Sequence, residues 1–185
     1  MPTLSFVSEL VETVSEAVRE AEAKLRESGV APEALAAFVP ERRKLLIRRK
    51  PTMQPLGHVW RLGTLMIGAD AGSPPALYVV GKATRSAARL HPGNQSVSRE
   101  ERRDVAAAAL HGGYAEGTPV NYDAVQIALD EATLTSLAPE LPLGLVDGEI
   151  RVRWRAGAPL DGAQTLRAYL RERSELLAHP PQGAS

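Results

Sequence analysis

The chain has 185 residues, of which 44% are hydrophobic and 24% charged, and it contains no cysteine. Length and composition indicate one globular domain, and the lack of cysteine excludes disulfides, thiol nucleophiles, iron–sulfur clusters and cysteine-based zinc sites. The 22 Lys and Arg balance the 22 Asp and Glu, which argues against a chain-wide basic field for nucleic acid. Because no apolar run reaches the roughly 18 residues of a membrane span and the first residues lack a secretory-signal pattern, we expect a soluble, cytoplasmic protein.

The first predicted element is an amphipathic helix from about Leu4 to Ser28, ended by Gly29. Its apolar residues recur at helical spacing: Val7, Leu10, Val11, Val14, Val18, Ala21 and Leu25. Four glutamates lie on the opposite side: Glu9, Glu12, Glu16 and Glu20. This acidic stripe is either a solvated face or a surface for a partner.

A second helix is predicted over residues 32–39, because Pro32 suits its first turn and Pro40 interrupts it. Residues 42–50 contain six basic side chains. Their short apolar run fits a helix or a strand equally well. Two prolines and a glycine predict a loop over residues 51–57.

From residue 58 the helical period is lost and strand-forming residues dominate. Residues 58–68 and 77–87 read as two strands of a hairpin with a longer loop between them. Gly63 and Gly81 lie inside these strands, where a glycine marks a bulge or a close backbone contact.

A helix is predicted after a polar loop, because Ser98 and Glu101 form a capping box. It ends at Gly112 and Gly113. A third strand is expected around residues 124–129, followed by an irregular stretch or a short helical turn over residues 131–142.

Residues 143–154 give the strongest hairpin signal in the chain. Asp147 and Gly148 fit a type I′ turn. Apolar and basic residues alternate after the turn, which predicts a core face and an arginine face. The core face has Ile150, Val152 and Trp154, and the other has Arg151, Arg153 and Arg155.

The last predicted helix runs from about Asp161 to Ala178, and residues 179–185 are expected to form a disordered tail. Together these elements predict an α+β fold in a single domain over residues 1–178. We expect a mostly antiparallel sheet of about five strands, with the N-terminal, middle and C-terminal helices packed mainly on one face.

The best-marked catalytic motifs are missing. The chain has no phosphate-binding G-x-x-x-x-G-K-[ST], no dinucleotide G-x-G-x-x-G, no G-x-S-x-G or S-x-x-K, and no H-E-x-x-H. Enzymes without such motifs are common, so the sequence leaves open whether the chain is an enzyme. It predicts no cofactor and no metal.

The loop over residues 91–99 is the candidate ligand site, because it leads into a helix start that carries arginines. Free backbone N–H groups and guanidinium groups there can hold a phosphate or carboxylate. The candidate ligand-binding residues are Asn94, Gln95, Ser96, Arg99 and Arg102. The alternative is an ordinary loop before a well-capped helix.

Weaker catalytic candidates flank this loop. His91, His111 and Asp123 can supply an acid/base pair if the 112–123 loop meets the 91–99 loop. The alternatives are structural: a histidine at a helix C-terminus is favoured by the helix dipole, and the second loop fits ordinary turn chemistry.

The basic segment over residues 42–50 can contact phosphates, together with the three arginines of the last strand. Alternatively, the N-terminal glutamates neutralise it within the fold or across a dimer. Balanced charge and an aromatic content of 4% argue against a nucleic-acid partner.

Three stretches resemble short actinobacterial proteins of unknown function: WRLG (Trp60–Gly63), LYVVGKATR (Leu77–Arg85) and HPPQGA (His179–Ala184). The resemblance implies a bacterial, cytoplasmic setting and no particular reaction. Some such proteins are described as glutaminases. The sequence does not support that description, because the serine-dependent enzymes use an S-x-x-K pair and the cysteine-dependent ones a cysteine.

We therefore expect a non-enzymatic binding or protein-interaction module, acting with a protein partner or as a homo-oligomer. The alternative is a protein that binds a small anionic ligand, or a hydrolase without a marked motif. Its site would lie between the 91–99 and 112–123 loops.

Overall fold

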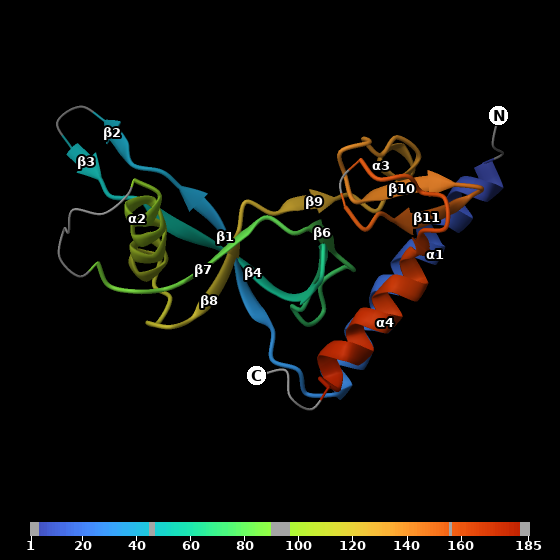
Figure 1. Cartoon of the computed structure of the whole chain (residues 1–185), viewed down its shortest axis with the longest axis horizontal. Coiled ribbons are helices and arrows are strands. Elements are labelled where there is room, and N and C mark those ends of the chain that lie inside the picture. Colours follow the sequence, from blue (N-terminus) through green and yellow to red (C-terminus); the bar gives the residue numbers. More distant parts are fainter. Residues whose placement is uncertain (1–3, 45–46, 90–96, 156, 182–185) are drawn as a thin grey trace. The chain divides into compact units, whose positions relative to one another are not determined.

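The computed structural model of the chain describes residues 4–44, 47–89, 97–155 and 157–181. Four helices occur there: α1 (Leu4–Glu27), α2 (Val97–His111), α3 (Glu131–Thr135) and α4 (Leu166–Ala178). The strands are β1 (Glu33–Val39), β2 (Arg42–Lys44), β3 (Ile47–Arg49), β4 (Thr52–Leu62), β5 (Leu65–Gly68), β6 (Leu77–Val79), β7 (Lys82–Arg85), β8 (Pro119–Tyr122), β9 (Val125–Ile127), β10 (Leu143–Val146), β11 (Glu149–Val152) and β12 (Gln164–Thr165). The fold is α+β, as predicted (Figure 1).

Seven strands form the main sheet, in the order β7-β8-β1-β4-β5-β6-β9. The sheet is mixed, because β1 and β8 pair in parallel while β1 and β4 pair antiparallel. Two small sheets, β10-β11-β12 and β2-β3, accompany it. The prediction of about five strands was therefore too low. The prediction of a mostly antiparallel sheet was not exact, because β1 and β8 form a parallel pair. That the helices cover mainly one face stays a prediction.

Contacts divide the chain into two compact units. Unit 1 comprises Met1–Pro32, Trp60–Val80 and Val125–Ser185, and unit 2 comprises Glu33–Val59 and Gly81–Ala124. The chain passes from one unit to the other four times, and β4 contributes residues to both. The single domain over 1–178 stays a prediction, and the tail expected over 179–185 lies partly outside the described residues.

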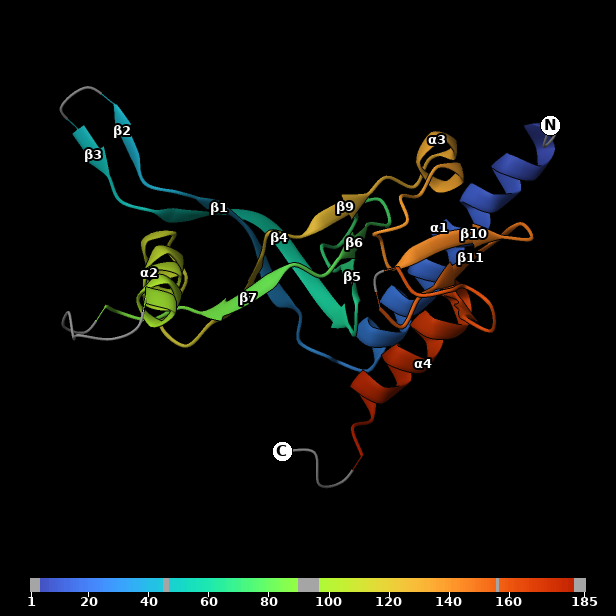
Figure 2. The same ribbon diagram turned by 45° about the horizontal axis from the view of Figure 1, so that its top comes forward.

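Unit 1 contains the first helix, which matches the prediction closely. The apolar stripe of α1 is buried against α4 and the strands of this unit, and α1 and α4 lie side by side (Figures 1 and 2). The hydrophobic core of unit 1 includes Leu10, Val14, Val18, Leu25, Leu65, Ile67, Leu166 and Leu170. Helix α4 begins at Leu166 rather than Asp161, because Gln164 and Thr165 pair with β11 as β12. The Thr165 hydroxyl caps the helix by accepting a hydrogen bond from the Ala168 N–H.

The hairpin of β10 and β11 is confirmed. Asp147 and Gly148 both adopt positive φ, 50° and 83°, as a type I′ turn requires. Ile150 and Val152 are buried on the predicted core face. The prediction for Trp154 is wrong: β11 ends at Val152, and the Trp154 side chain is 73% exposed.

Unit 2 overturns the second predicted helix. Residues 33–39 form strand β1, between β4 and β8. Pairing on both sides buries Leu35 and its neighbours, and this outweighs the weak helix preference of an alanine-rich segment. Residues 42–50, which were ambiguous, contain strands β2 and β3.

The loop predicted over residues 51–57 is also wrong, because β4 begins at Thr52. The register between β1 and β4 shifts at Leu35/Ala36, so that Pro55 stands opposite Ala36 and Leu56 is an extra residue. A proline is tolerated in a strand at such a bulge.

The predicted hairpin over residues 58–87 consists of four strands instead of two. Gly63 lies in the turn between β4 and β5 with φ +67°. Gly81 separates β6 from β7 and passes against the backbone carbonyls of Tyr122 and Asp123. The close contact predicted for Gly81 is therefore confirmed.

Helix α2 ends before Gly112 and Gly113, as predicted. It begins at Val97, so Ser98 lies in its first turn and is not the N-cap that the sequence suggested. Part of the third expected strand is present as β9 (Val125–Ile127), and α3 is the expected short helical turn.

Strand β8 (Pro119–Tyr122) was not predicted. It contains a proline and a buried asparagine, both of which are depleted in strands. Asn121 is 1% exposed, and its amide donates to a carboxylate oxygen of Glu33 at 2.7 Å. This hydrogen bond compensates for burying a polar side chain in the sheet.

Candidate functional site

The predicted ligand loop lies largely outside the described residues, since these exclude His91, Asn94, Gln95 and Ser96. Arg99 and Arg102 are exposed on the first turns of α2. The Arg102 Nε donates to the Ser98 carbonyl at 3.0 Å. The anion site at this loop therefore stays a prediction.

His111 and Asp123 have separate partners. The His111 Nδ1 lies 3.2 Å from the Pro51 carbonyl oxygen. Asp123 has φ 55° and accepts a hydrogen bond from the Lys82 Nζ at 3.1 Å, which raises the pKa of Lys82 above its usual value. Within the described ranges no interaction joins His111 to Asp123, and no cluster of three His, Asp or Glu could hold a metal. The acid/base pair stays a prediction.

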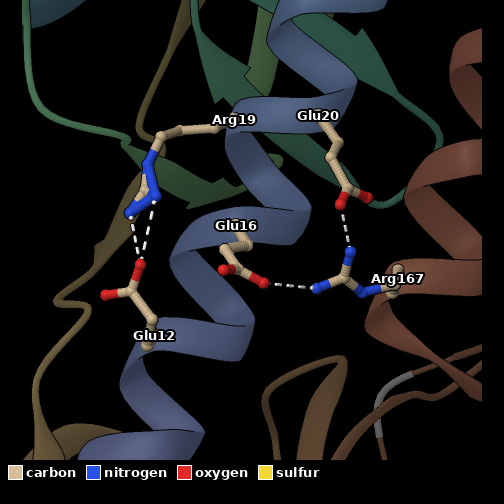
Figure 3. A network of polar contacts seen from close by, with 5 residues as sticks. All are labelled: Glu12, Glu16, Arg19, Glu20 and Arg167. Atoms are coloured by element: carbon tan, nitrogen blue, oxygen red, sulfur yellow. Dashed lines mark hydrogen bonds and ion pairs between the residues drawn. The ribbon is translucent and has the colours of Figure 1, made fainter.

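The acidic stripe of α1 is partly neutralised inside unit 1 (Figure 3). Arg167 of α4 bridges two of its glutamates, contacting Glu16 at 3.0 Å and also Glu20. The hydrogen bond to Glu20, and to a smaller extent that to Glu16, raises the pKa of Arg167. Arg19 pairs with Glu12 at 3.1 Å. Such exposed pairs stabilise little, about 0–1 kcal/mol each, but the two arginines offset half of the negative charge of the stripe.

The balanced total charge hides a division between the units. Unit 1 has 10 Lys and Arg against 15 Asp and Glu, a net charge of −5. Unit 2 has 12 against 7, a net charge of +5. The basic residues of unit 2 are concentrated between β1 and β4.

These residues belong to a two-stranded extension of unit 2, which we call the basic arm (residues 37–44 and 47–54). The antiparallel register continues without a shift from Ala37↔Gln54 to Arg42↔Arg49 and Lys44↔Ile47. Strand β8 pairs with β1 only at Ala34, Leu35 and Ala36. In the described residues no third strand flanks the arm, and β2 and β3 extend β1 and β4 (Figures 1 and 2).

Like charges stand opposite each other in this arm. Arg42 is the cross-strand partner of Arg49, and Arg43 is the partner of Arg48. Opposed like charges destabilise a strand pair. Glu41 is the one acidic residue of the arm's sequence, against Arg42, Arg43, Lys44, Arg48, Arg49 and Lys50. The arm's sequence thus has a net charge of +5.

In contrast, Arg151 of β11 and Arg153 of the following loop donate hydrogen bonds to backbone carbonyls within unit 1. Arg151 donates to the Ala163 carbonyl at 3.0 Å. Arg153 donates to the carbonyls of Ala158 at 2.9 Å and Leu141 at 3.1 Å, and also to that of Leu143. These two arginines hold backbone segments together and are not free for a phosphate.

A pocket of about 510 Å³ in unit 1 is lined in part by Arg153. Trp154, Tyr169 and Arg173 contribute to its wall, with the Arg173 guanidinium 5.3 Å from the Tyr169 ring. The Arg155 guanidinium lies 4.5 Å from the Trp154 ring. The sequence did not indicate this pocket, because Trp154 was assigned to the core.

The exposure of Trp154 leads to a direct prediction. Trp60, the other tryptophan, is 3% exposed and donates from Nε1 to the Val30 carbonyl at 2.8 Å. We expect acrylamide to distinguish an accessible and an inaccessible class of tryptophan fluorescence. The accessible class should disappear in Trp154→Phe and remain in Trp60→Phe. Stern–Volmer plots measure this. An unchanged accessible fraction in Trp154→Phe would show that this side chain is covered.

No protein-family model, no curated protein and no solved structure matches this chain. No helix in the described ranges is long and apolar enough to cross a bilayer. The actinobacterial resemblance and the cytoplasmic location stay predictions.

Proposed function

We propose that this chain is a non-enzymatic binding module that attaches to an acidic macromolecule through the basic arm of unit 2. The observation that carries the proposal is the register of the arm, which sets Arg42 opposite Arg49 and Arg43 opposite Arg48. Like charges directly opposite each other destabilise a strand pair. A partner that supplies negative charge offsets this repulsion and adds attraction.

The charge of the whole unit supports the same function. The net charge of +5 on unit 2 attracts an acidic partner over about 8–10 Å, the screening length at physiological salt. The acidic stripe of α1 is the weaker candidate for the binding surface, because Arg19 and Arg167 already pair with it. The expected homo-oligomer through this stripe is thus less favoured than a separate acidic partner.

The alternative from the sequence, a small-anion site between the 91–99 and 112–123 loops, has less support. Of its candidate ligands, Arg99 and Arg102 are exposed side chains on α2. These two arginines therefore serve as a matched control: replacing them removes as much charge as replacing two arginines of the arm.

Retention on heparin, a generic polyanion, tests the proposal with the full chain. We expect the wild type to bind at low salt and the Arg42→Gln/Arg49→Gln variant to elute at clearly lower salt. The Arg99→Gln/Arg102→Gln variant should elute close to the wild type. Circular dichroism melting confirms that all three are folded. No retention of the wild type, or equal shifts in both variants, would contradict a binding role for the arm.

A further inference from the structure

The most exposed large apolar side chain of the described residues belongs to the pocket of unit 1. It is that of Trp154, which is 73% exposed and lines this pocket of about 510 Å³. The Arg155 guanidinium lies 4.5 Å from the indole ring and leaves most of it uncovered. The volume lies within the roughly 300–1,000 Å³ of small-molecule sites. The pocket therefore has the size of a ligand site and an aromatic ring available at its wall.

Hydrogen bonds hold the wall of this pocket in place. The Tyr169 hydroxyl accepts from the Thr64 N–H at 3.0 Å, which ties α4 to the β4–β5 turn. Arg151 of β11 donates to the Ala163 carbonyl at 3.0 Å. Beside it, Gly162 adopts φ +70°, a conformation that suits glycine. Because these segments are fixed before a ligand arrives, little free energy is lost in ordering them on binding.

The charged side chains of the wall are not paired with one another. The Arg173 guanidinium lies 5.3 Å from the Tyr169 ring, and among the described residues it has no hydrogen bond or ion pair. Asp161 has none there either. Glu172 accepts one hydrogen bond, from the Gln164 amide at 2.6 Å. The two arginines and two acidic residues of the wall give it no net charge, so it presents free donors and free acceptors together.

This combination discriminates among ligands that stack on an aromatic ring. A nucleotide would bring its phosphates close to the carboxylates of Asp161 and Glu172. A quaternary ammonium ion, which also binds aromatic rings, would meet the Arg173 guanidinium. A neutral sugar has an apolar C–H face that packs on an indole ring. Each of its hydroxyls both donates and accepts, so that guanidinium, carboxylate and amide groups can all bond to it without ionic repulsion.

From these observations we infer that the pocket of unit 1 binds a pyranose unit of a neutral carbohydrate. The sugar ring stacks on Trp154, and its hydroxyls bond to Asp161, Glu172 and Arg173. This inference goes beyond the proposed function, because the pocket lies in unit 1 and the basic arm in unit 2. A neutral sugar also has no charge for the arm to attract.

Isothermal titration calorimetry of the full chain tests the inference with neutral tetrasaccharides of glucose, galactose, mannose and N-acetylglucosamine. Concentrations up to about 10 mM exceed a weak dissociation constant of about 1 mM. We expect saturable binding of at least one sugar. Trp154→Ala should weaken this binding by about tenfold, the loss of roughly 1.4 kcal/mol that an aromatic contact supplies. Asp161→Asn and Arg173→Gln should also weaken it.

Two exposed residues of α4 that lie outside the pocket wall provide matched controls. Arg171→Gln is the control for Arg173→Gln, and Leu176→Ala is the control for Trp154→Ala. Both should bind the sugar like the wild type. Circular dichroism melting checks that every variant is folded. If Trp154→Ala does not fold, acrylamide quenching of the wild type decides, because a bound sugar should protect the accessible tryptophan.

Three results would overturn the inference. They are no binding of any sugar of the panel, undiminished binding by folded Trp154→Ala, and saturable binding of AMP without binding of a sugar. Sugar binding that leaves the accessible tryptophan unprotected would also overturn it. Heparin retention of the arginine variants of the basic arm is measured separately, so the proposed function and this inference can fail independently.

Discussion

Replacing Gly81 by alanine is expected to lower the free energy of unfolding by about 3 kcal/mol, a typical upper value for overpacking. The added Cβ would overlap the backbone carbonyl oxygens of Tyr122 and Asp123. Neither can rotate away, because β8 is paired on both sides, with β7 and with β1. For a chain of this size the melting temperature should fall by about 6–12 °C, which calorimetry measures.

The adjacent Lys82→Ala variant is the control for this change. Lys82 is exposed and forms a 3.1 Å ion pair with Asp123, and such pairs contribute about 0–1 kcal/mol. Its melting temperature should therefore stay close to that of the wild type. A Gly81→Ala variant that melts with the wild type would mean that the backbones do not approach each other at this point.

Replacing Tyr169 by phenylalanine is expected to cost about 2–3 kcal/mol, since each buried polar group left without a partner costs about 1–3 kcal/mol. The Tyr169 hydroxyl donates to the Leu62 carbonyl at 2.9 Å and accepts from the Thr64 N–H at 3.0 Å. The variant loses both bonds at the β4–β5 turn. The midpoint of urea unfolding measures the loss, with an unchanged slope expected.

The Tyr78→Phe variant is the control for this change, because it also removes a tyrosine hydroxyl. Tyr78 is a half-buried residue of β6. Its pKa is raised by burial and, secondarily, by Asp70, and no hydrogen bond to its hydroxyl occurs in the described residues. We expect a change within about 0.5 kcal/mol, as at most positions without a specific role. Equal effects of the two variants would refute the bridging role of Tyr169.

Local sequence patterns were enough to predict the elements that are determined by their own residues and not by distant neighbours. The spacing of Leu10, Val14 and Val18 was enough for α1, and Asp147 with Gly148 was enough for the β10–β11 turn. Residues 33–39 were mispredicted because their strand depends on two neighbours, β4 and β8, that are distant in the sequence.

The candidate site was less accessible to sequence reasoning than the fold. The six basic residues over 42–50 were recognised, but their cross-strand pairing requires a known register, and the apolar run between them fits either a helix or a strand. The contrast between a net charge of +5 on unit 2 and −5 on unit 1 emerges only once the separate segments of each unit are grouped. Trp154 continues the alternation of β11 in sequence, and only the end of the strand at Val152 reveals that it is exposed.

The order in which the ribosome makes this chain differs from the order in which its parts can be completed. Helix α1 is made early, but its packing partner α4 follows only after the whole of unit 2. At synthesis rates of about 5–20 residues per second, the interval is on the order of ten seconds. During that time the apolar stripe with Val14, Val18 and Leu25 lacks its final cover. The nascent chain therefore offers chaperones an amphipathic helix, while unit 2 already has all its strands.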